Sequence, residues 1–300
     1  MTLTANEKFL PFVIEKNIFL GDMTIPFHKY QGTGNDFVMI DQRTTQYLKK
    51  TDTAIIKQLC DRRFGIGADG LMFLAKKEGF DFEMIYFNAD GSESSMCGNG
   101  GRCLTAFAHY LSVFKEKCRF LAIDGAHEAI VKSDCTNENL GNAVWVELKM
   151  IDVKDVEIGK DYYLMNTGSP HYVVFVEDLT DIDVYENGRA IRYSERFFTE
   201  GVNVNFVEIK KGEGIEVATY ERGVEAETYS CGTGVTAAAI AYHLRTGAKT
   251  TVPITTKGGD LAVHFQEKKA SNAPNTEGVF SEVWLCGPAT QVFESRINIR

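Results

Sequence analysis

Two stretches of this sequence place a cysteine in the same setting, directly ahead of a glycine-rich turn that leads into an apolar, helix-forming run. Residues 96–102 read Met-Cys-Gly-Asn-Gly-Gly-Arg, and residues 230–234 read Ser-Cys-Gly-Thr-Gly. A residue just before a helix faces unpaired backbone N–H groups and the positive end of the helix dipole. Because this environment favours a thiolate, we expect Cys97 and Cys231 to have lowered pKa values and to be reactive.

The two cysteines belong to a longer internal repeat with an offset of 134 positions (231 − 97). A long period held between unlike residue types predicts two similar domains, not a solenoid. Two domains related by an approximate twofold axis would place the two thiols on opposite sides of one cleft. The same offset relates several other pairs, among them Arg62 and Arg196, Phe64 and Phe198, His109 and His243, and Asp69 and Asn203.

The pattern of strands and helices predicts an α+β fold. Short strand-like runs alternate with glycine-punctuated turns in each half, and each half contains one long apolar helix behind its cysteine. We therefore expect two pseudo-symmetric domains, each a mostly antiparallel sheet or barrel wrapped around a central helix, with the active site in the cleft between them. We expect an N-terminal extension at 1–23, a first domain at 24–143, a second at 144–282, and a short helix at 191–198.

Composition narrows the classes of partner and compartment. The net charge of −9 argues against a nucleic-acid partner, and no apolar run approaches the roughly 20 residues that span a bilayer. The charged first 22 residues do not resemble a signal peptide, and seven cysteines, an odd number, indicate reduced thiols in the cytoplasm. We expect no metal, because the spacing of Cys97 and Cys103 does not fit a zinc pair.

Two facing thiols suit the inversion of a stereocentre without a cofactor. One thiolate removes a proton from a carbon atom, and the opposite thiol returns a proton to the other face. The turn amides of Gly98, Asn99, Gly232 and Thr233 are placed to hold an α-carboxylate between two helix N-termini. There they would also stabilise the negative charge that develops as the proton leaves.

Seven short motifs, found in order from about Thr24 to the C-terminus, resemble those of the diaminopimelate epimerase family. They lie at 32–37 (Gly-Thr-Gly-Asn-Asp-Phe), 87–92 (Phe-Asn-Ala-Asp-Gly-Ser), 96–103 (Met-Cys-Gly-Asn-Gly-Gly-Arg-Cys), 168–171 (Gly-Ser-Pro-His), 220–225 (Tyr-Glu-Arg-Gly-Val-Glu), 230–234 (Ser-Cys-Gly-Thr-Gly) and 287–289 (Gly-Pro-Ala). The resemblance implies a cofactor-independent epimerase that interconverts LL- and meso-diaminopimelate in the lysine and peptidoglycan pathways. It also implies a homodimer, and a C-terminal segment at 283–300 that joins the first domain.

The resemblance assigns roles to residues of both halves. It implies Cys97 and Cys231 as the acid/base thiols, with His171 and Glu221 beside them as catalytic residues. It implies a substrate site lined by both glycine turns and by a set of polar side chains: Asn35, Asn88, Asn99, Ser169, Asn203, Glu221, Arg222 and Thr233. Two positions depart from the family pattern, because Ser169 stands where Asn is frequent and Gly70 stands where a Gln often contacts substrate.

Other interpretations remain open. A proline or hydroxyproline racemase would use the same two thiols on a smaller, cyclic substrate, whereas isomerases of phenazine synthesis lack the cysteine pair. A thiol redox protein is a different class, but its usual Cys-x-x-Cys motif is absent. His171 also has a structural interpretation, as an imidazole bonded to backbone. The other cysteines (Cys60, Cys103, Cys118, Cys135 and Cys286) are expected to be small buried residues.

Overall fold

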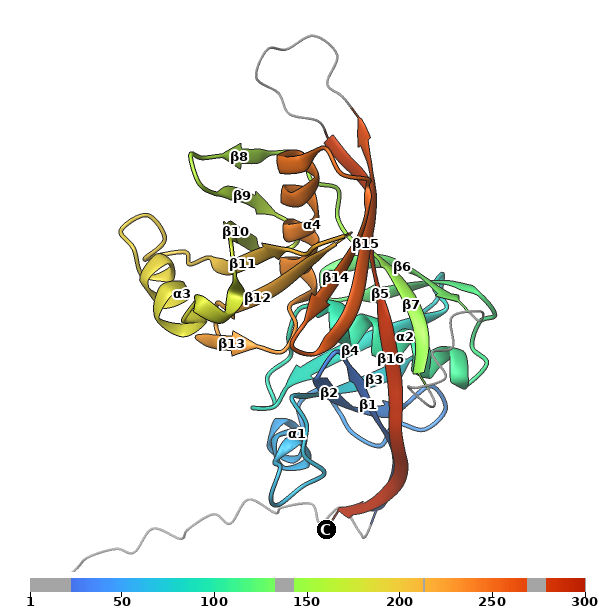
Figure 1. The fold of residues 1–300 in the computed structure, drawn as a ribbon. Coiled ribbons are helices and arrows are strands. Elements are labelled where there is room, and N and C mark those ends of the chain that lie inside the picture. Colours follow the sequence, from blue (N-terminus) through green and yellow to red (C-terminus); the bar gives the residue numbers. More distant parts are fainter. Residues whose placement is uncertain (1–22, 133–142, 213, 269–278, 300) are drawn as a thin grey trace, which may run out of the picture.

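The computed structural model describes residues 23–132, 143–212, 214–268 and 279–299 (Figure 1). Most of the expected N-terminal extension and Cys135 lie outside the described residues. Met23, the last residue of that extension, is the first residue of strand β1. The domain boundaries proposed from the sequence remain a proposal.

The first half of the chain contains seven strands and two helices of the described structure. In order these are β1 (Met23–Gly32), β2 (Asn35–Asp41), α1 (Thr53–Cys60), β3 (Gly70–Ala75), β4 (Phe82–Asn88), α2 (Gly98–Tyr110), β5 (Lys117–Ala122), β6 (Gly125–Lys132) and β7 (Ala143–Lys149).

The second half repeats this order and ends in one long strand. Its elements are β8 (Val156–Ile158), β9 (Tyr163–Asn166), β10 (Pro170–Val176), the short 3₁₀ helix η2 (Leu179–Asp181), α3 (Val184–Arg192), β11 (Asn203–Ile209), β12 (Ile215–Glu221), β13 (Ala226–Thr228), α4 (Gly232–Thr246), β14 (Thr251–Thr256), β15 (Gly259–Lys268) and β16 (Val279–Ile299). Helices α2 and α4 begin at Gly98 and Gly232, which are related by the offset of 134 found in the sequence.

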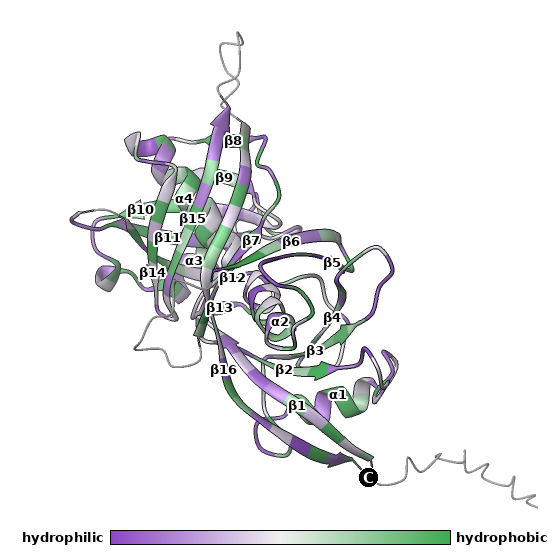
Figure 2. Cartoon of the chain, turned by 90° about the vertical axis from the view of Figure 1, so that its right-hand side faces the viewer, coloured by the Kyte–Doolittle hydropathy of each residue, from purple (hydrophilic) through white to green (hydrophobic). Residues whose placement is uncertain are grey.

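The strands of the first half close into a barrel. Its order is β1-β2-β3-β4-β5-β6-β7-β16, and β16 also pairs with β1. Seen along its axis in Figure 2, α2 lies inside this ring, and residues 98–108 of the helix are all buried. Most pairings are antiparallel; the parallel ones are β2–β3, β4–β5, β10–β11 and β12–β14.

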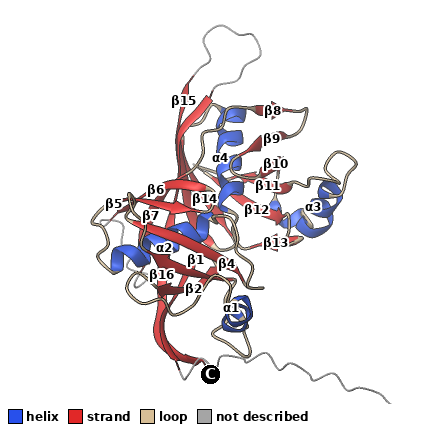
Figure 3. Ribbon diagram, turned by 180° about the vertical axis from the view of Figure 1, so that it is seen from behind, coloured by secondary structure: helices blue, strands red, loops and turns tan. Residues whose placement is uncertain are grey.

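The second half surrounds α4 in the same way, while α1 and α3 lie outside the sheets (Figures 1 and 3). Met39, Met72 and Met84 belong to the core around the two central helices, whereas the alternate residues of their strands pack in a separate cluster with α1. The expected α+β fold, with two similar domains each wrapped around one central helix, is therefore confirmed.

Strand β16 joins the two halves. Its residues up to Cys286 pair with β15, and those from Gly287 onward pair with β7 and then with β1. The segment that follows β7 crosses in the opposite direction, from the first half to the second. In it the Met150 amide donates to Val283 O at 2.8 Å, and Val153 forms a bridge with Phe280. These two crossing segments hold the halves together by backbone hydrogen bonds.

Two details of the sequence interpretation need correction. The expected helix at 191–198 is wrong, because α3 starts earlier, at Val184, where the Asp183 side chain accepts a hydrogen bond from the Glu186 amide. The expected equivalence of Asp69 and Asn203 is wrong by one residue. Phe37 and His171 are related by the offset of 134 (171 − 37). The parallel partner of Phe37 is Gly70, and the parallel partner of His171 is Asn203, so Gly70 is the counterpart of Asn203.

Candidate active site

A cleft of about 630 Å³ lies between the two halves, where the N-termini of α2 and α4 meet. Both cysteines line it, together with all but one of the other site residues that the sequence predicts. These are Asn35, Asn88, Gly98, Asn99, Ser169, Asn203, Glu221, Arg222, Gly232 and Thr233. His171 is the exception, because it is fully buried and does not line the cleft.

The two helix tips touch at their glycines. Cys97 and Cys231 occupy the N-cap positions in extended conformation, so each thiol precedes the first helical turn. A Cβ atom added to Gly232 would lie 3.4 Å from the Gly98 Cα and 2.8 Å from a methyl carbon of Leu285. Glycine is therefore needed for this close approach, and each first turn brings unpaired backbone amides to the contact.

The expected lowering of the two thiol pKa values is wrong. Burial raises the pKa of Cys97 above 9.0, more than the amides of Gly100 and Asn99 lower it. Burial likewise raises the pKa of Cys231 to about 12, and the Glu221 carboxylate adds to that rise. Desolvation outweighs the helix N-terminus here, because both cysteines are enclosed between the two halves.

This result makes the pH dependence of thiol alkylation testable. Because both pKa values are raised, the thiolate fraction is small at pH 7 and increases about tenfold per pH unit below the pKa. We expect the rate of iodoacetamide labelling at Cys97 and Cys231 to increase about a hundredfold from pH 7 to pH 9 without a plateau. Peptide mass spectrometry after timed quenching measures it, and a plateau below pH 8 at either residue would contradict the burial argument.

The Cys97 thiol faces an oriented amide. Its Sγ donates to Asn35 Oδ1 at 3.6 Å, and Asn35 Nδ2 donates to Asp69 Oδ2 at 2.6 Å. Asp69 also accepts from Arg62 at 2.7 Å. Since Asp69 holds the amide nitrogen of Asn35, the carbonyl oxygen is turned toward the sulfur, as an acceptor for a protonated thiol.

The Cys231 thiol faces a chain of donors. Thr233 Oγ1 lies 3.5 Å from its Sγ and 2.8 Å from His171 Nε2. Asn205 Nδ2 lies 3.1 Å from His171 Nδ1, and the Asn205 carbonyl accepts from Thr219 at 3.0 Å. Nδ1 is thus an acceptor, so the proton of the neutral ring is on Nε2 and is donated to Thr233, whose hydroxyl is then free to donate to the sulfur.

Burial also keeps the imidazole neutral. It lowers the pKa of His171 to about 3, and the nearby Arg222 charge lowers it further. His171 therefore lies behind Thr233 as a buried, uncharged member of the hydrogen-bond chain. The structural interpretation of this residue, an imidazole bonded to backbone, is not borne out, because the contacts of its ring nitrogens are with the side chains of Thr233, Asn203 and Asn205.

The Asn99 side chain joins the two halves at the base of the cleft. Its Nδ2 donates to Ser230 O at 3.0 Å, and its Oδ1 accepts from Arg102 Nη2 at 3.1 Å. Arg102 is fully buried, and the same Nη2 donates to Thr33 at 3.1 Å. The amide is therefore fixed in orientation, and with it the first turn of α2.

The opposite wall carries a cation and a carboxylate. Arg222 donates to Glu200 O at 2.8 Å and to Ser169 Oγ at 3.3 Å, and among the described residues it has no acidic partner. Asn203 accepts from the Arg222 amide at 2.8 Å. Burial raises the pKa of Glu221 above its ordinary value.

Several residues that line the cleft were not predicted as site residues from the sequence, among them Asp69 and Tyr86. Only the repeat draws attention to Asp69 in the sequence, and no motif draws attention to Tyr86, yet both line the cleft. Asp69 follows a glycine-rich loop, which is a weak signal for a site. No sequence signal distinguishes Tyr86 from a core aromatic residue, because it stands in an apolar strand whose neighbouring residues are buried.

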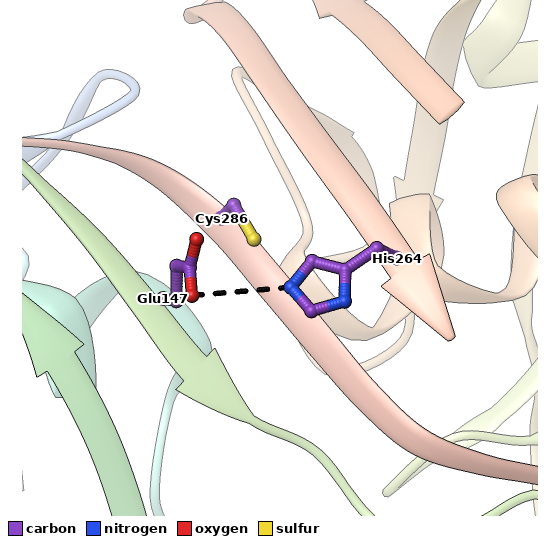
Figure 4. Close-up of side chains that lie close together, drawn as sticks. All are labelled: Glu147, His264 and Cys286. Atoms are coloured by element: carbon purple, nitrogen blue, oxygen red, sulfur yellow. Dashed lines mark ion pairs between the residues drawn. The ribbon is translucent and has the colours of Figure 1, made fainter. Parts of the chain in front are cut away.

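A separate group of potential metal ligands lies on the strand crossing, outside this cleft. Donor atoms of Glu147, His264 and Cys286 lie within 4.8 Å of one another on β7, β15 and β16 (Figure 4). Lys132 lies 3.6 Å from Glu147, and burial raises the pKa of Cys286 to about 12 although the charges of Arg102 and Lys132 oppose the rise. Two adjoining cations oppose the binding of a metal ion there. The absence of a metal stays a prediction.

Within the described part of the chain, no helix has both the length and the apolar character needed to cross a membrane.

Comparisons with known proteins agree on one family. The model of the family described as diaminopimelate epimerase matches residues 27–146 and 163–278. A diaminopimelate epimerase of Flavobacterium psychrophilum is 47% identical over 273 residues, covering 90% of this chain and 99% of that protein. Another, from Aquifex aeolicus, is 38% identical over 290 residues and covers 91% and 97% of the two chains.

Solved structures share the fold at low sequence identity. A phenazine biosynthesis protein of the PhzF family from Bacillus anthracis has a TM-score of 0.69 at 13% identity, covering 92% of this chain and 100% of that chain. A hydroxyproline epimerase from Agrobacterium vitis has a TM-score of 0.61 at 13% identity, covering 92% and 93%. The family model and the relatives, which extend over most of the chain, are decisive, and the protein belongs to the diaminopimelate epimerase family.

Proposed function

We propose that this protein interconverts LL- and meso-diaminopimelate by two-thiol proton transfer at the α-carbon, without a cofactor. The observation that carries the proposal is the meeting of two cysteine-capped helix N-termini in one cleft. Family membership supports the substrate. The other residues of the cleft support a substrate with two polar ends, because they provide both a cation, Arg222, and carboxylates, Asp69 and Glu221.

In this proposal the α-carboxylate of the substrate binds between the two helix tips. The amides of Gly98, Asn99, Gly232 and Thr233 donate to its oxygen atoms, and both helix dipoles favour the negative charge. The contact between the two glycines supports this arrangement, since it brings the first turns of both helices together at one place in the cleft. The same donors stabilise the carbanion as its charge spreads into the carboxylate.

The chemical step moves one proton on each face of the α-carbon. The thiolate of one cysteine takes the α-proton; the C–H bond breaks, and its electron pair stays on carbon. The S–H bond of the other cysteine then breaks, and its proton adds to the opposite face, which leaves the configuration inverted. Because the pKa of each thiol is raised by burial, the positive charge of the substrate ammonium group is expected to assist formation of the thiolate.

His171 and Glu221 take supporting roles in this proposal. Glu221 lines the cleft near both thiols and is placed to accept a hydrogen bond from the substrate ammonium group. His171 acts through Thr233 on Cys231, as the hydrogen-bond chain described above supports. In this role His171 positions Thr233 and does not touch the reacting atoms.

The surroundings of the reaction are part of the same proposal. We place it in lysine and peptidoglycan precursor biosynthesis in the cytoplasm, and we expect a homodimer. The exposed apolar side chains of Tyr110, Val292 and Phe293 support a dimer, because a second copy would remove them from water. Sedimentation of the purified protein measures its oligomeric state.

The reaction itself is tested by incubation in deuterated water. With LL-diaminopimelate we expect meso product that carries one deuterium at the inverted α-carbon, because the returning proton comes from a thiol that exchanges with solvent. Nuclear magnetic resonance and mass spectrometry measure isomer and label together. A parallel sample with proline separates the racemase alternative: turnover of proline in place of diaminopimelate would refute the substrate.

A further inference from the structure

The two walls of the cleft differ at one pseudo-symmetric position. Gly70 on β3 and Asn203 on β11 are counterparts, since they are the parallel partners of Phe37 and His171. Asn203 presents an amide at the second wall, where it contacts Ser169 and Arg222. At the first wall the corresponding position has no side chain.

The space at Gly70 is filled by Tyr86 from the neighbouring strand β4. A Cβ atom added to Gly70 would lie 2.5 Å from the Tyr86 ring carbon Cε2 and 3.1 Å from its hydroxyl oxygen. The same atom would lie 2.6 Å from the carbonyl oxygen of Phe87, so no other residue type fits at this position without movement. The absence of a side chain at Gly70 is what allows the phenol to reach the cleft.

The Tyr86 ring is held firmly while its hydroxyl is free. It forms an edge-to-face pair with Phe37, with ring centroids 5.9 Å apart, and its backbone carbonyl accepts from the Ser94 amide at 2.9 Å. Among the described residues no group hydrogen-bonds to the hydroxyl, although Tyr86 lines the cleft. By contrast the hydroxyl of Tyr220, on the outer face of β12, donates to Glu225 at 3.1 Å.

The surroundings of Tyr86 keep its hydroxyl protonated. Burial raises the pKa of Tyr86 well above its ordinary value, and the nearby groups Cys97, Asp69 and Glu221 raise it further. A neutral phenol both donates and accepts a hydrogen bond, so it can serve either the carboxylate or the ammonium group of an amino-acid head. Its closeness to Cys97 places it beside the thiol side of the cleft.

We propose that Tyr86 is a substrate-binding residue whose hydroxyl hydrogen-bonds to the amino-acid head of the substrate on the Cys97 side, in the place that the Asn203 amide occupies on the other wall. This inference rests on the proposed function for the identity of the substrate. It gives the Gly70–Tyr86 pair a role in specificity, because a polar contact there favours a ligand with a polar group within reach.

The test is Tyr86→Phe, which removes one oxygen atom and leaves the ring packing intact. We expect KM for LL-diaminopimelate to increase about tenfold, equivalent to about 1.4 kcal/mol, with a smaller change in kcat. The matched control is Tyr220→Phe, which also removes a tyrosine hydroxyl. This hydroxyl belongs to the second half and lies outside the cleft. It is expected to keep the KM of the natural sequence.

Each outcome has a distinct meaning. If Tyr86→Phe binds and converts substrate as the natural sequence does, the inference is wrong, while the proposed function stands. If instead the pH dependence of Cys97 alkylation shifts and KM does not, the hydroxyl acts on the thiol and not on the substrate, which also overturns the inference. A natural sequence that is inactive on diaminopimelate refutes the proposed function itself.

Discussion

Alanine in place of either Cys97 or Cys231 is expected to reduce epimerisation by at least about a thousandfold in both directions, since positioned acid/base groups contribute up to about 10⁴-fold each. The reason is that each thiol serves one face of the α-carbon, and no other group at either helix N-cap can exchange a proton. The loss should appear in kcat, because both substitutions leave the carboxylate-binding amides in place. Coupled assays started from LL- and from meso-diaminopimelate measure it.

The deuterium experiment sharpens this prediction. In a variant with one thiol, the remaining thiol can still remove the α-proton and return a deuteron to the same face. We therefore expect slow labelling of one stereoisomer without inversion, and of opposite stereoisomers in the Cys97→Ala and Cys231→Ala proteins. A single variant with near-normal turnover in both directions would eliminate the two-thiol mechanism.

The matched control for these variants is Cys118→Ala. Cys118 is buried in β5, inside the core of the first barrel and away from the cleft. Its removal leaves a small cavity that costs about 1 kcal/mol of stability, so the melting temperature should fall by a few degrees while kcat stays unchanged. Circular dichroism of all three variants separates loss of catalysis from loss of fold.

The sequence was sufficient to predict the fold and the position of the thiols because both depend on local patterns. The glycine-rich turn at Gly98–Gly101 predicts the start of one helix, and the similar turn at 230–234 predicts the start of its counterpart in the second half. Burial was not predictable in the same way. The raised pKa values of the thiols depend on contact between two helix tips that lie more than a hundred residues apart in the chain.

The remaining differences have similar causes. The start of α3 was recoverable, because Asp183 followed three residues later by Glu186 is a helix-capping signal that the apolar spacing at 191–198 obscured. The one-residue difference between the repeats was not recoverable from the sequence. An insertion that is balanced by a nearby deletion leaves the offset the same on both sides, so the offset does not reveal it. Only the strand pairing shows that Gly70 matches Asn203, and only the packing at Gly70 shows that Tyr86 fills the space there.

Arg222→Lys is expected to reduce kcat/KM for diaminopimelate by about a hundredfold, because a lysine cannot reproduce a bidentate contact with the distal carboxylate. The guanidinium is oriented for this contact, since Glu200 O and Ser169 Oγ accept from it on one side and no described acidic residue neutralises it. Losing one partner of a charged hydrogen bond in a closed site costs about 2–5 kcal/mol, so about a hundredfold, or near 2.7 kcal/mol, is within this range.

The control for this variant is Arg196→Lys. Arg196 forms a two-point pair with Glu157, at 2.9 and 2.6 Å, and does not line the cleft, so the same chemical change should leave kcat/KM unaltered. Iodoacetamide should label Cys97 and Cys231 of the Arg222→Lys protein at the normal rate, because the thiols do not depend on the distal cation. Normal turnover of diaminopimelate by Arg222→Lys would mean that the distal head binds elsewhere, and the substrate assignment would then lose its main structural support even if both thiols proved essential.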